Sequence, residues 1–262
     1  MTVSVIIPMY NASRSIVSTL ESVRNQTYRD FEIIIINDGS EDLSGQIVSD
    51  YIADNSHLNI VLLNQENKGV SAARNMGLRT AKGDWIALLD SDDEWLPNKI
   101  ERQIEIVNKH LEVDFLGTNR NGDVFKNFFF KKIGSLTRMY PKDLLYKMFF
   151  ITPTVMFKRS ILKEVNSFDE TQSFCEDGNF FIKVCQKKSC FLLNESLVVT
   201  GGGKAHFGES GLSSNMWQMQ QGELLNIKYA FKSGIVNIVE FGFIYAFSMF
   251  KYLRRVWIVK TT

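Results

Sequence analysis

The first hundred residues alternate short apolar runs with longer segments in which apolar side chains recur every three or four positions. Continuous apolar runs are typical of strands buried on both faces of a parallel sheet, and the longer spacing indicates helices with one apolar face. The predicted strands are residues 3–7, 31–36, 59–63 and 85–89. The predicted helices are residues 12–25, 43–52, 70–81 and 97–111. This alternation predicts βαβ units: a Rossmann-like, mostly parallel central sheet flanked by helices.

The pattern is weaker after residue 111. We predict strands and loops for residues 112–150, with a Phe-rich patch at Phe128-Phe129-Phe130. Helices are expected again over residues 158–165 and 177–187. No Pro/Gly/Ser-rich linker interrupts the chain, so one α/β body is expected.

Polar loops follow the four predicted strands. In an open α/β sheet the ligand binds at the carboxyl ends of the strands, so these loops should form one binding rim. They are Pro8-Met9-Tyr10-Asn11, Asn37-Asp38-Gly39-Ser40, residues 64–69, and Asp90-Ser91-Asp92-Asp93.

The last loop carries three carboxylates within four residues, Asp90, Asp92 and Asp93. Their mutual repulsion would raise their pKa values unless a cation is present. Oxygen ligands suit Mg²⁺ or Mn²⁺, which keeps several waters and bridges carboxylates to substrate phosphates. The alternative is that Asp92 or Asp93 only caps a following helix.

Three further groups lie on the same rim. Asp38 is either part of an ordinary turn or an acceptor for the ribose or base of a nucleotide. Lys68 and Arg74 flank a predicted helix start, where phosphate is favoured, although a lone arginine there could equally be solvated.

Charge and cysteine content limit the kinds of partner and cofactor that are expected. The formal net charge of +1 gives no reason to expect nucleic acid as a partner. The cysteines, Cys175, Cys185 and Cys190, are odd in number and lack CxxC spacing, which argues against a disulfide framework or a zinc site and fits a reducing cytoplasm. The N-terminus lacks the pattern of a signal peptide.

The C-terminal segment is basic and aromatic. Its longest apolar stretch, residues 235–250, is interrupted by Asn237 and Glu240 and is shorter than the roughly 20 residues of a membrane span. From residue 227 onward, six basic residues accompany one acidic residue, and a second basic stretch occupies residues 120–147. The segment either lies on a membrane surface or packs on the body with a solvated basic face.

A glycine-rich segment, Gly201 to Gly208, contains His206. Such a loop could close over a bound ligand and exclude water. His206 is either a metal or phosphate ligand or a structural residue of the turn.

Four motifs occur in order along the chain: Val-Ile-Ile-Pro-Met-Tyr-Asn, Asn-Asp-Gly-Ser, Gly-Val-Ser-Ala-Ala-Arg-Asn-Met-Gly and Leu-Leu-Asp-Ser-Asp-Asp. Together they resemble the motifs of the inverting family 2 glycosyltransferases. The resemblance covers residues 3–100 and, more loosely, residues 153–183. It is specific for the family but not for a sugar.

The resemblance implies a GT-A fold and assigns roles to individual residues. Asp38 and Asp90 are similar to residues that hold uridine, Asp92 to the metal ligand of the DxD motif, and Asp177 to the general base. Inverting transfer independently requires a carboxylate that takes the acceptor proton and a metal that neutralises the departing diphosphate. Glu176 and Asp177 could otherwise be helix-start acids.

The resulting assignment of residues is as follows. The catalytic residues are Asp177 and Glu176; the nucleotide-sugar-binding residues are Pro8, Tyr10, Asn11, Asp38, Lys68, Arg74, Asp90 and Ser91; the metal ligands are Asp92, Asp93 and His206.

We predict three functional parts: a nucleotide-sugar-binding half (1–100), an acceptor-binding and catalytic half (101–215), and a C-terminal helical, membrane-associating extension (216–262). The expected reaction is Mn²⁺- or Mg²⁺-dependent inverting transfer of a hexose, glucose or galactose, from a UDP-sugar to a glycan hydroxyl. It would serve cell-surface polysaccharide, lipopolysaccharide or O-antigen synthesis. The expected acceptor is a lipid-linked or other glycan at the inner face of the cytoplasmic membrane, and a homodimer is compatible with the sequence.

Two other functions are considered. A glycoside hydrolase also uses paired carboxylates but needs no metal-diphosphate site. A non-catalytic nucleotide-binding module would share the α/β half without needing Asp177. A nicotinamide-dependent oxidoreductase is disfavoured because no Gly-x-Gly-x-x-Gly follows the first strand.

Overall fold

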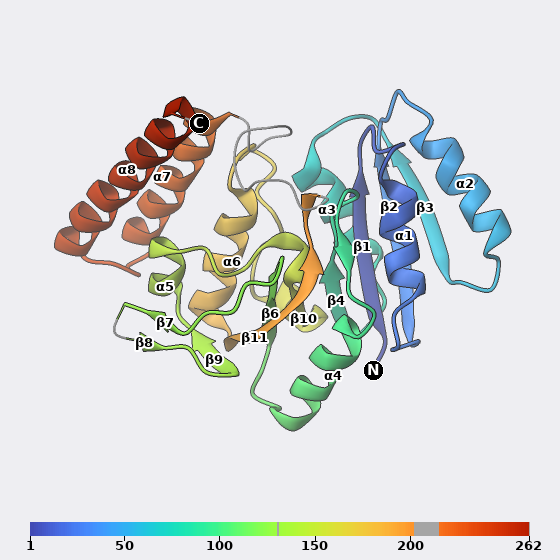
Figure 1. Ribbon diagram of the computed structural model, residues 1–262, viewed down its shortest axis with the longest axis horizontal. Helices are drawn as coiled ribbons and strands as arrows, with labels where there is room; N and C mark the ends of the chain where they lie inside the picture. The colour runs from blue at the N-terminus through green and yellow to red at the C-terminus, as the bar shows by residue number, and fades with distance from the viewer. Residues whose placement is uncertain (130, 202–214, 262) are drawn as a thin grey trace.

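The structure, a computed structural model, describes residues 1–129, 131–201 and 215–261, and shows a central sheet between two layers of helices (Figure 1). The first half alternates strand and helix as the hydrophobic pattern predicts. Its elements are β1 (Val3–Met9), α1 (Ile16–Arg24), β2 (Phe31–Asp38), α2 (Ser44–Asp54), β3 (Ile60–Gln65), α3 (Val70–Thr80), β4 (Trp85–Leu88), the short β5 (Glu94–Trp95) and α4 (Lys99–Lys109).

The main sheet has the strand order β3-β2-β1-β4-β10-β6-β11-β5, and β9 also pairs with β11. β1 pairs in parallel with β2 on one side and with β4 on the other. The order therefore reverses at β1, and the loops that follow β1 and β4 lie side by side. This reversal is where an open α/β sheet forms its ligand crevice.

Each face of the sheet has its own apolar core. On one face, Ile33 and Ile35 of β2 pack with Leu20 of α1 and with apolar residues of α2 and α4. On the other face, Ile34 and Ile36 pack with residues of α3, α6 and α7. β2 is apolar on both sides because both faces are covered by helices.

The second half completes the sheet and adds short elements around it. These are β6 (Phe115–Arg120), β7 (Asn127–Phe128), β8 (Lys131–Lys132), β9 (Leu136–Met139), α5 (Pro141–Tyr146), the 3-10 turn Thr152–Thr154, β10 (Met156–Lys158), the 3-10 turn Arg159–Lys163, α6 (Glu176–Lys187) and β11 (Cys190–Val199). The expected strands and loops of residues 112–150 are present, with α5 in addition.

The helix predicted over residues 158–165 is wrong. Lys158 ends β10, which pairs antiparallel with both β4 and β6, and only a 3-10 turn follows it. Met156 and Phe157 are buried in the middle of the sheet. Ile161 lies in this turn and Val165 two residues beyond its end, and both are buried, so their helical spacing reflects burial without an α-helix.

β11 was not predicted. Buried and exposed side chains do not alternate regularly along this strand. It pairs in parallel with β6, and it pairs antiparallel with β9 and β5 along different parts of its length. The pairing with β6 is also irregular between Leu192 and Val198. The neighbours of this strand come from segments distant in sequence.

The C-terminal extension is a helical hairpin. α7 (Met216–Lys232) packs Ile227 and Ala230 into the core, and α8 (Ile238–Thr261) follows a turn at Gly234. In Figure 1 the hairpin lies at the opposite end of the molecule from α2. Within the described ranges, no helix has the length and apolar character needed to cross a bilayer.

Candidate active site

A cavity of about 670 Å³ opens at the carboxyl ends of β1 to β4. Its walls are the loops after these strands, the start of α3 and the segment that leads into α6. We call it the donor cavity. Ten of the residues singled out from the sequence line it: Pro8, Tyr10, Asn11, Asp38, Lys68, Arg74, Asp90, Ser91, Asp92 and Glu176. Tertiary structure therefore brings the four polar loops to one place.

The loops after β1 and β2 are held together by hydrogen bonds. The backbone N–H of Asn11 donates to Ser40 Oγ at 3.0 Å, and Asn11 Oδ1 accepts from the backbone N–H of Glu41 at 2.9 Å. Asn11 has a left-handed φ of 49°, a conformation that asparagine tolerates better than most residues. The rim next to Tyr10 is thus ordered before any ligand binds.

Asp38 links the loop after β2 to the start of α3. Its carboxylate accepts from the backbone N–H groups of Lys68 and Gly69, each at 2.9 Å, and from Gln65 Nε2 at 2.7 Å. The adjacent Gly39 has φ +71°, and a Cβ there would lie 2.7 Å from Asn67 N. Asp38 therefore lines the donor cavity and also holds two of its loops together through hydrogen bonds.

Arg74 occupies the centre of the site. It lies one turn inside α3 with its side chain 5% exposed. Nη2 donates to Asp90 Oδ1 at 2.9 Å, and Nη1 donates to Glu176 Oε1 at 2.7 Å. The guanidinium also lies over the Phe168 ring, 5.3 Å from its centroid. Arg74 thereby joins the loop after β4 to the start of α6, and its neighbours Asp90 and Glu176 raise its pKa although burial opposes this.

The acidic cluster is split by the fold. Asp90 and Asp92 line the donor cavity, whereas Asp93 is absent from its lining and is buried, with Oδ1 accepting from the backbone N–H of Gly201 at 2.9 Å. Burial raises the pKa of Asp93 to about 8, and the nearby Asp90 and Asp92 carboxylates add to the rise. The hydrogen bond from Gly201 and the positive charge of Arg120 act in the opposite direction.

The residues present fit a divalent cation shared with a diphosphate. Within the described part of the chain, no three acidic, histidine or cysteine side chains form a metal site by themselves. Two carboxylates in the lining of the donor cavity, Asp90 and Asp92, nevertheless match Mg²⁺ or Mn²⁺, which takes one or two carboxylates and completes its shell with phosphate oxygens and water.

Glu176 and Asp177 begin α6 beside Arg74. Burial and the neighbouring Asp177 raise the pKa of Glu176 to about 7, against the opposing effect of Arg74. Asp177 Oδ2 accepts from Thr152 Oγ1 at 3.4 Å, and burial raises the pKa of Asp177 as well. Glu176 faces the donor cavity, and Asp177 lies next to it on the side of Thr152.

Some residues of the site were not identified from the sequence. Glu170, Gln172 and Ser173 also line the donor cavity, and Ser71 Oγ has no hydrogen-bond partner among the described residues. Glu170, Gln172 and Ser173 lie within residues 153–183, where the resemblance is looser, and Ser71 lies in the third motif; no pattern in the sequence marks them individually. His206 lies outside the described residues, so its assignment stays a prediction.

Two solved structures with this architecture contain a nucleotide sugar. TarS residues 1–349 from S. aureus, in complex with UDP-GlcNAc, matches 95% of this chain and 72% of that chain with a TM-score of 0.69 and 22% identity. A mannosyltransferase, PcManGT from Pyrobaculum calidifontis with GDP-Man and Mn²⁺, matches 94% of this chain and 68% of that chain with a TM-score of 0.68 and 18% identity. These likenesses confirm the GT-A fold.

Curated relatives are similar in sequence. The amylovoran biosynthesis glycosyltransferase AmsB of Erwinia amylovora is 29% identical over 232 residues, which are 82% of this chain and 75% of that protein. The glycosyltransferase GlyG of Streptococcus pneumoniae is 37% identical over 134 residues, which are 50% of this chain and 44% of that protein. The family model described as Glycosyl transferase family 2 matches residues 4–165, more than half of the chain. This protein therefore belongs to glycosyl transferase family 2.

Proposed function

We propose that this glycosyltransferase transfers a hexose, glucose or galactose, from a UDP-sugar to a glycan hydroxyl by an inverting, divalent-metal-dependent single displacement. An α-linked donor would give a β-linked product. The process served would be the synthesis of a cell-surface polysaccharide or lipopolysaccharide, including O-antigen. The observation that carries the proposal is the convergence of Asp90, Asp92, Arg74 and Glu176 on one cavity with Asp177 beside it.

The first hundred residues would bind the donor. The loop that contains Pro8, Tyr10 and Asn11 forms one wall, where the base and ribose would lie between Tyr10 and Asp38. Lys68 and the amino end of α3 would meet the diphosphate, since helix N-termini favour anions. TarS supports a uridine donor, because its structure contains UDP-GlcNAc.

A divalent cation would be held by Asp92 and the donor diphosphate, with Asp90 and Ser91 next to it. When bound, the cation neutralises charge that develops on the departing nucleoside diphosphate. Asp93 lies behind the cavity wall, so we assign it to electrostatic support of the cluster. PcManGT, which contains Mn²⁺ with GDP-Man, supports the use of such a cation.

Asp177 would act as the general base in the catalytic half, residues 101–215. It would take the proton of the attacking hydroxyl while the anomeric carbon inverts. Thr152 holds one carboxylate oxygen and the backbone N–H of Gly178 holds the other, at 3.4 Å and 2.6 Å. Glu176 would set the position of Arg74, and through it that of Asp90.

The acceptor would be a lipid-linked or other glycan, and transfer would take place at the cytoplasmic face of the membrane. Support comes from α8, which carries exposed large apolar side chains along one face: Val239, Phe243, Phe250, Leu253 and Trp257. These positions are separated by four, seven, three and four residues, so they form one stripe. The exposed Arg254 lies beside it and would favour an anionic surface.

The proposal is tested by measuring UDP release from a panel of UDP-sugars with Mn²⁺, with and without glycan acceptors. We expect release with one hexose donor, loss of release on chelation, and recovery when Mn²⁺ is restored. Asp92→Asn should reduce release by at least about tenfold, since it removes a charged ligand. Asp54→Asn, the same change at an exposed aspartate of α2, should leave release unchanged.

Two results would reject the proposal. One is failure of every UDP-sugar to bind or react in the presence of Mn²⁺. The other is full activity in chelator, together with cleavage of glycosides in the absence of any nucleotide, which would indicate a hydrolase instead.

A further inference from the structure

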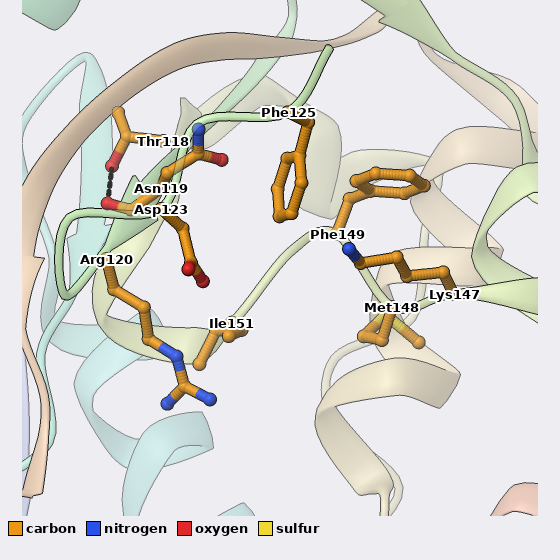
Figure 2. Close-up of a pocket in the computed structure, with 9 residues that line it drawn as sticks. All are labelled: Thr118, Asn119, Arg120, Asp123, Phe125, Lys147, Met148, Phe149 and Ile151. Carbon is orange, nitrogen blue, oxygen red and sulfur yellow. Dashed lines mark hydrogen bonds between the residues drawn. The ribbon is translucent and has the colours of Figure 1, made fainter. Parts of the chain in front are cut away.

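A second cavity, of about 380 Å³, lies between the end of β6 and the segment that follows α5 (Figure 2). We call it the β6 cavity. It shares no lining residue with the donor cavity. The residues that line it are Thr118, Asn119, Arg120, Asp123, Phe125, Lys147, Met148, Phe149 and Ile151.

The wall of the β6 cavity is connected to the proposed base, Asp177, although Asp177 itself does not line the cavity. Ile151 in its wall is followed by Thr152, whose hydroxyl donates to Asp177. Met148 in the same wall packs on Gly178, where an added Cβ would lie 2.8 Å from Met148 Cε. Two wall residues of this cavity are thus connected to the start of α6: Ile151 through Thr152 to Asp177, and Met148 directly to Gly178.

The framework of the cavity is ordered by Asn194 of β11. Asn194 Oδ1 accepts from Asn119 Nδ2 at 2.8 Å and from the backbone N–H of Phe125 at 2.9 Å. Asn194 Nδ2 donates to the Phe125 carbonyl at 2.7 Å. Asn119 Oδ1 has no hydrogen-bond partner among the described residues, so one acceptor in the wall is left unused.

Two cations face this cavity. Neither Lys147 nor Arg120 makes an ion pair with any residue that the structure describes, although Arg120 Nη1 donates to Thr200 Oγ1 at 2.9 Å. The acidic groups near them are Asp123, which faces both, and Asp93, which faces Arg120. Burial lowers the pKa of each cation. In Figure 2 the Lys147 ammonium lies beside Phe149, and the Arg120 guanidinium lies below Ile151, on the other side of the view.

Two aromatic rings form a corner beside Lys147. Phe125 and Phe149 are perpendicular, with centroids 5.5 Å apart. Lys147 Nζ lies 3.7 Å from the Phe125 centroid and 5.3 Å from the Phe149 centroid. Apolar faces combined with a few fixed polar groups are typical of a small-molecule site, and here they would suit the C–H face and the hydroxyls of a sugar ring.

We infer that the β6 cavity binds the acceptor sugar, and that this sugar carries an anionic substituent, a carboxylate or a phosphate. Lys147 and Arg120 would hold the anion, and Phe125 and Phe149 would contact the ring. Asp123 and Asn119 would accept hydrogen bonds from its hydroxyls. Charge-assisted hydrogen bonds to a partly desolvated cation are stronger than neutral ones, so the anion should dominate selection. The inference rests on the proposed function, because it places the acceptor against Asp177.

The test compares three probes in the presence of UDP and Mn²⁺. They are p-nitrophenyl β-D-glucoside, the matching β-D-glucuronide with a carboxylate at C6, and glucose 6-phosphate. Affinity is measured by calorimetry on the wild-type chain and on Lys147→Gln, Arg120→Gln and the double variant. Lys126→Gln is the matched control, because Lys126 is exposed in the loop next to Phe125.

We expect at least one anionic probe to bind about tenfold or more tightly than the glucoside, a ratio that corresponds to about 1.4 kcal/mol. The better of the two anionic probes identifies carboxylate or phosphate as the substituent. Lys147→Gln and Arg120→Gln should each reduce the preference, and the double variant should abolish it. Lys126→Gln should retain it.

The inference is overturned if neither anionic probe binds more tightly than the glucoside, or if the preference survives in the double variant. UDP affinity, measured in every variant, shows that the chain is folded and separates the two claims. A chain that binds UDP with Mn²⁺ but shows no charge preference contradicts this inference alone. A chain that binds no UDP contradicts the proposed function itself.

Discussion

At the scale of single residues, the site depends on carboxylates whose neighbours set their charge. Asp90 and Glu176 come from different halves of the chain and meet at one buried guanidinium, Arg74. Asp177, which follows Glu176, is held by Thr152 and Gly178 and makes no ion pair with another described residue. A base needs a free lone pair, so the proposed roles differ: Glu176 positions Arg74, and Asp177 accepts a proton.

The pH dependence of activity follows from the environment of Asp177. Burial raises its pKa above the ordinary value of 3.8. Only the ionised form can accept a proton, so activity should fall as pH falls through the raised pKa. We expect the acid limb of kcat/KM to have its midpoint above 3.8. A pH-rate profile with a saturating metal concentration measures it.

Asp177→Asn should lower kcat by about 10²- to 10⁴-fold, the usual contribution of a general base. UDP affinity should stay within about twofold, since Asp177 is absent from the lining of the donor cavity. Retention of more than about a tenth of the wild-type kcat would refute the assignment.

At the scale of elements, α3 contributes both to the donor cavity and to the packed core. Its amino end faces the donor cavity, and its later turns lie close to the sheet. A Cβ at Gly77 would lie 2.4 Å from Ile6 Cγ2 and 2.9 Å from Ile36 Cδ1. Glycine is thus required at this position by space and not by a special φ.

Gly77→Ala should therefore destabilise the chain by about 1–3 kcal/mol, the usual cost of overpacking a core. Gly242→Ala on α8 is the matched control, because nothing lies within 4 Å of its added Cβ. That change should be neutral or stabilise by up to about 1 kcal/mol, through lower backbone entropy in the unfolded chain. Urea unfolding measures both, and equal effects would contradict the close packing of α3 on β1.

At the scale of the whole molecule, the exposed stripe of α8 lies far from the strand β3 at the other edge of the sheet (Figure 1). Its opposite face packs on α7, with Ile244 buried. A solvent-exposed apolar stripe of this length usually marks an interaction site. Lys228 and Lys232 of α7 are also exposed and add positive charge to the hairpin.

Replacing Phe250 and Trp257 by serine should reduce binding to vesicles that contain anionic lipid by at least about tenfold, because two large apolar side chains are lost. Val124→Ser is the control, since Val124 is also exposed but lies in the loop after β6. Co-sedimentation in low and high salt measures the effect. Unchanged vesicle binding would reject membrane contact, and a change from dimer to monomer in analytical ultracentrifugation would assign the stripe to a homodimer instead.

The sequence by itself determined the first four strands, their helices and the polar loops at the strand ends. These features depend on local sequence. A strand in a sheet covered by helices on both faces must be apolar throughout, and a helix with one buried face must repeat its apolar residues every three or four positions. The four motifs also indicated the family correctly. The crowding of Asp90, Asp92 and Asp93 could be read directly because they are neighbours in the chain.

Only the tertiary structure decided what depends on contacts between distant segments. Met156 to Lys158 form a strand because β4 and β6 flank them, although the residues that follow have helical spacing. Arg74 meets Glu176 across 102 positions, which no local pattern can indicate. The same holds for the β6 cavity, where Asn194 of β11 orders residues of β6 and its loop. Periodicity reports which face of an element is buried, but not which element covers it.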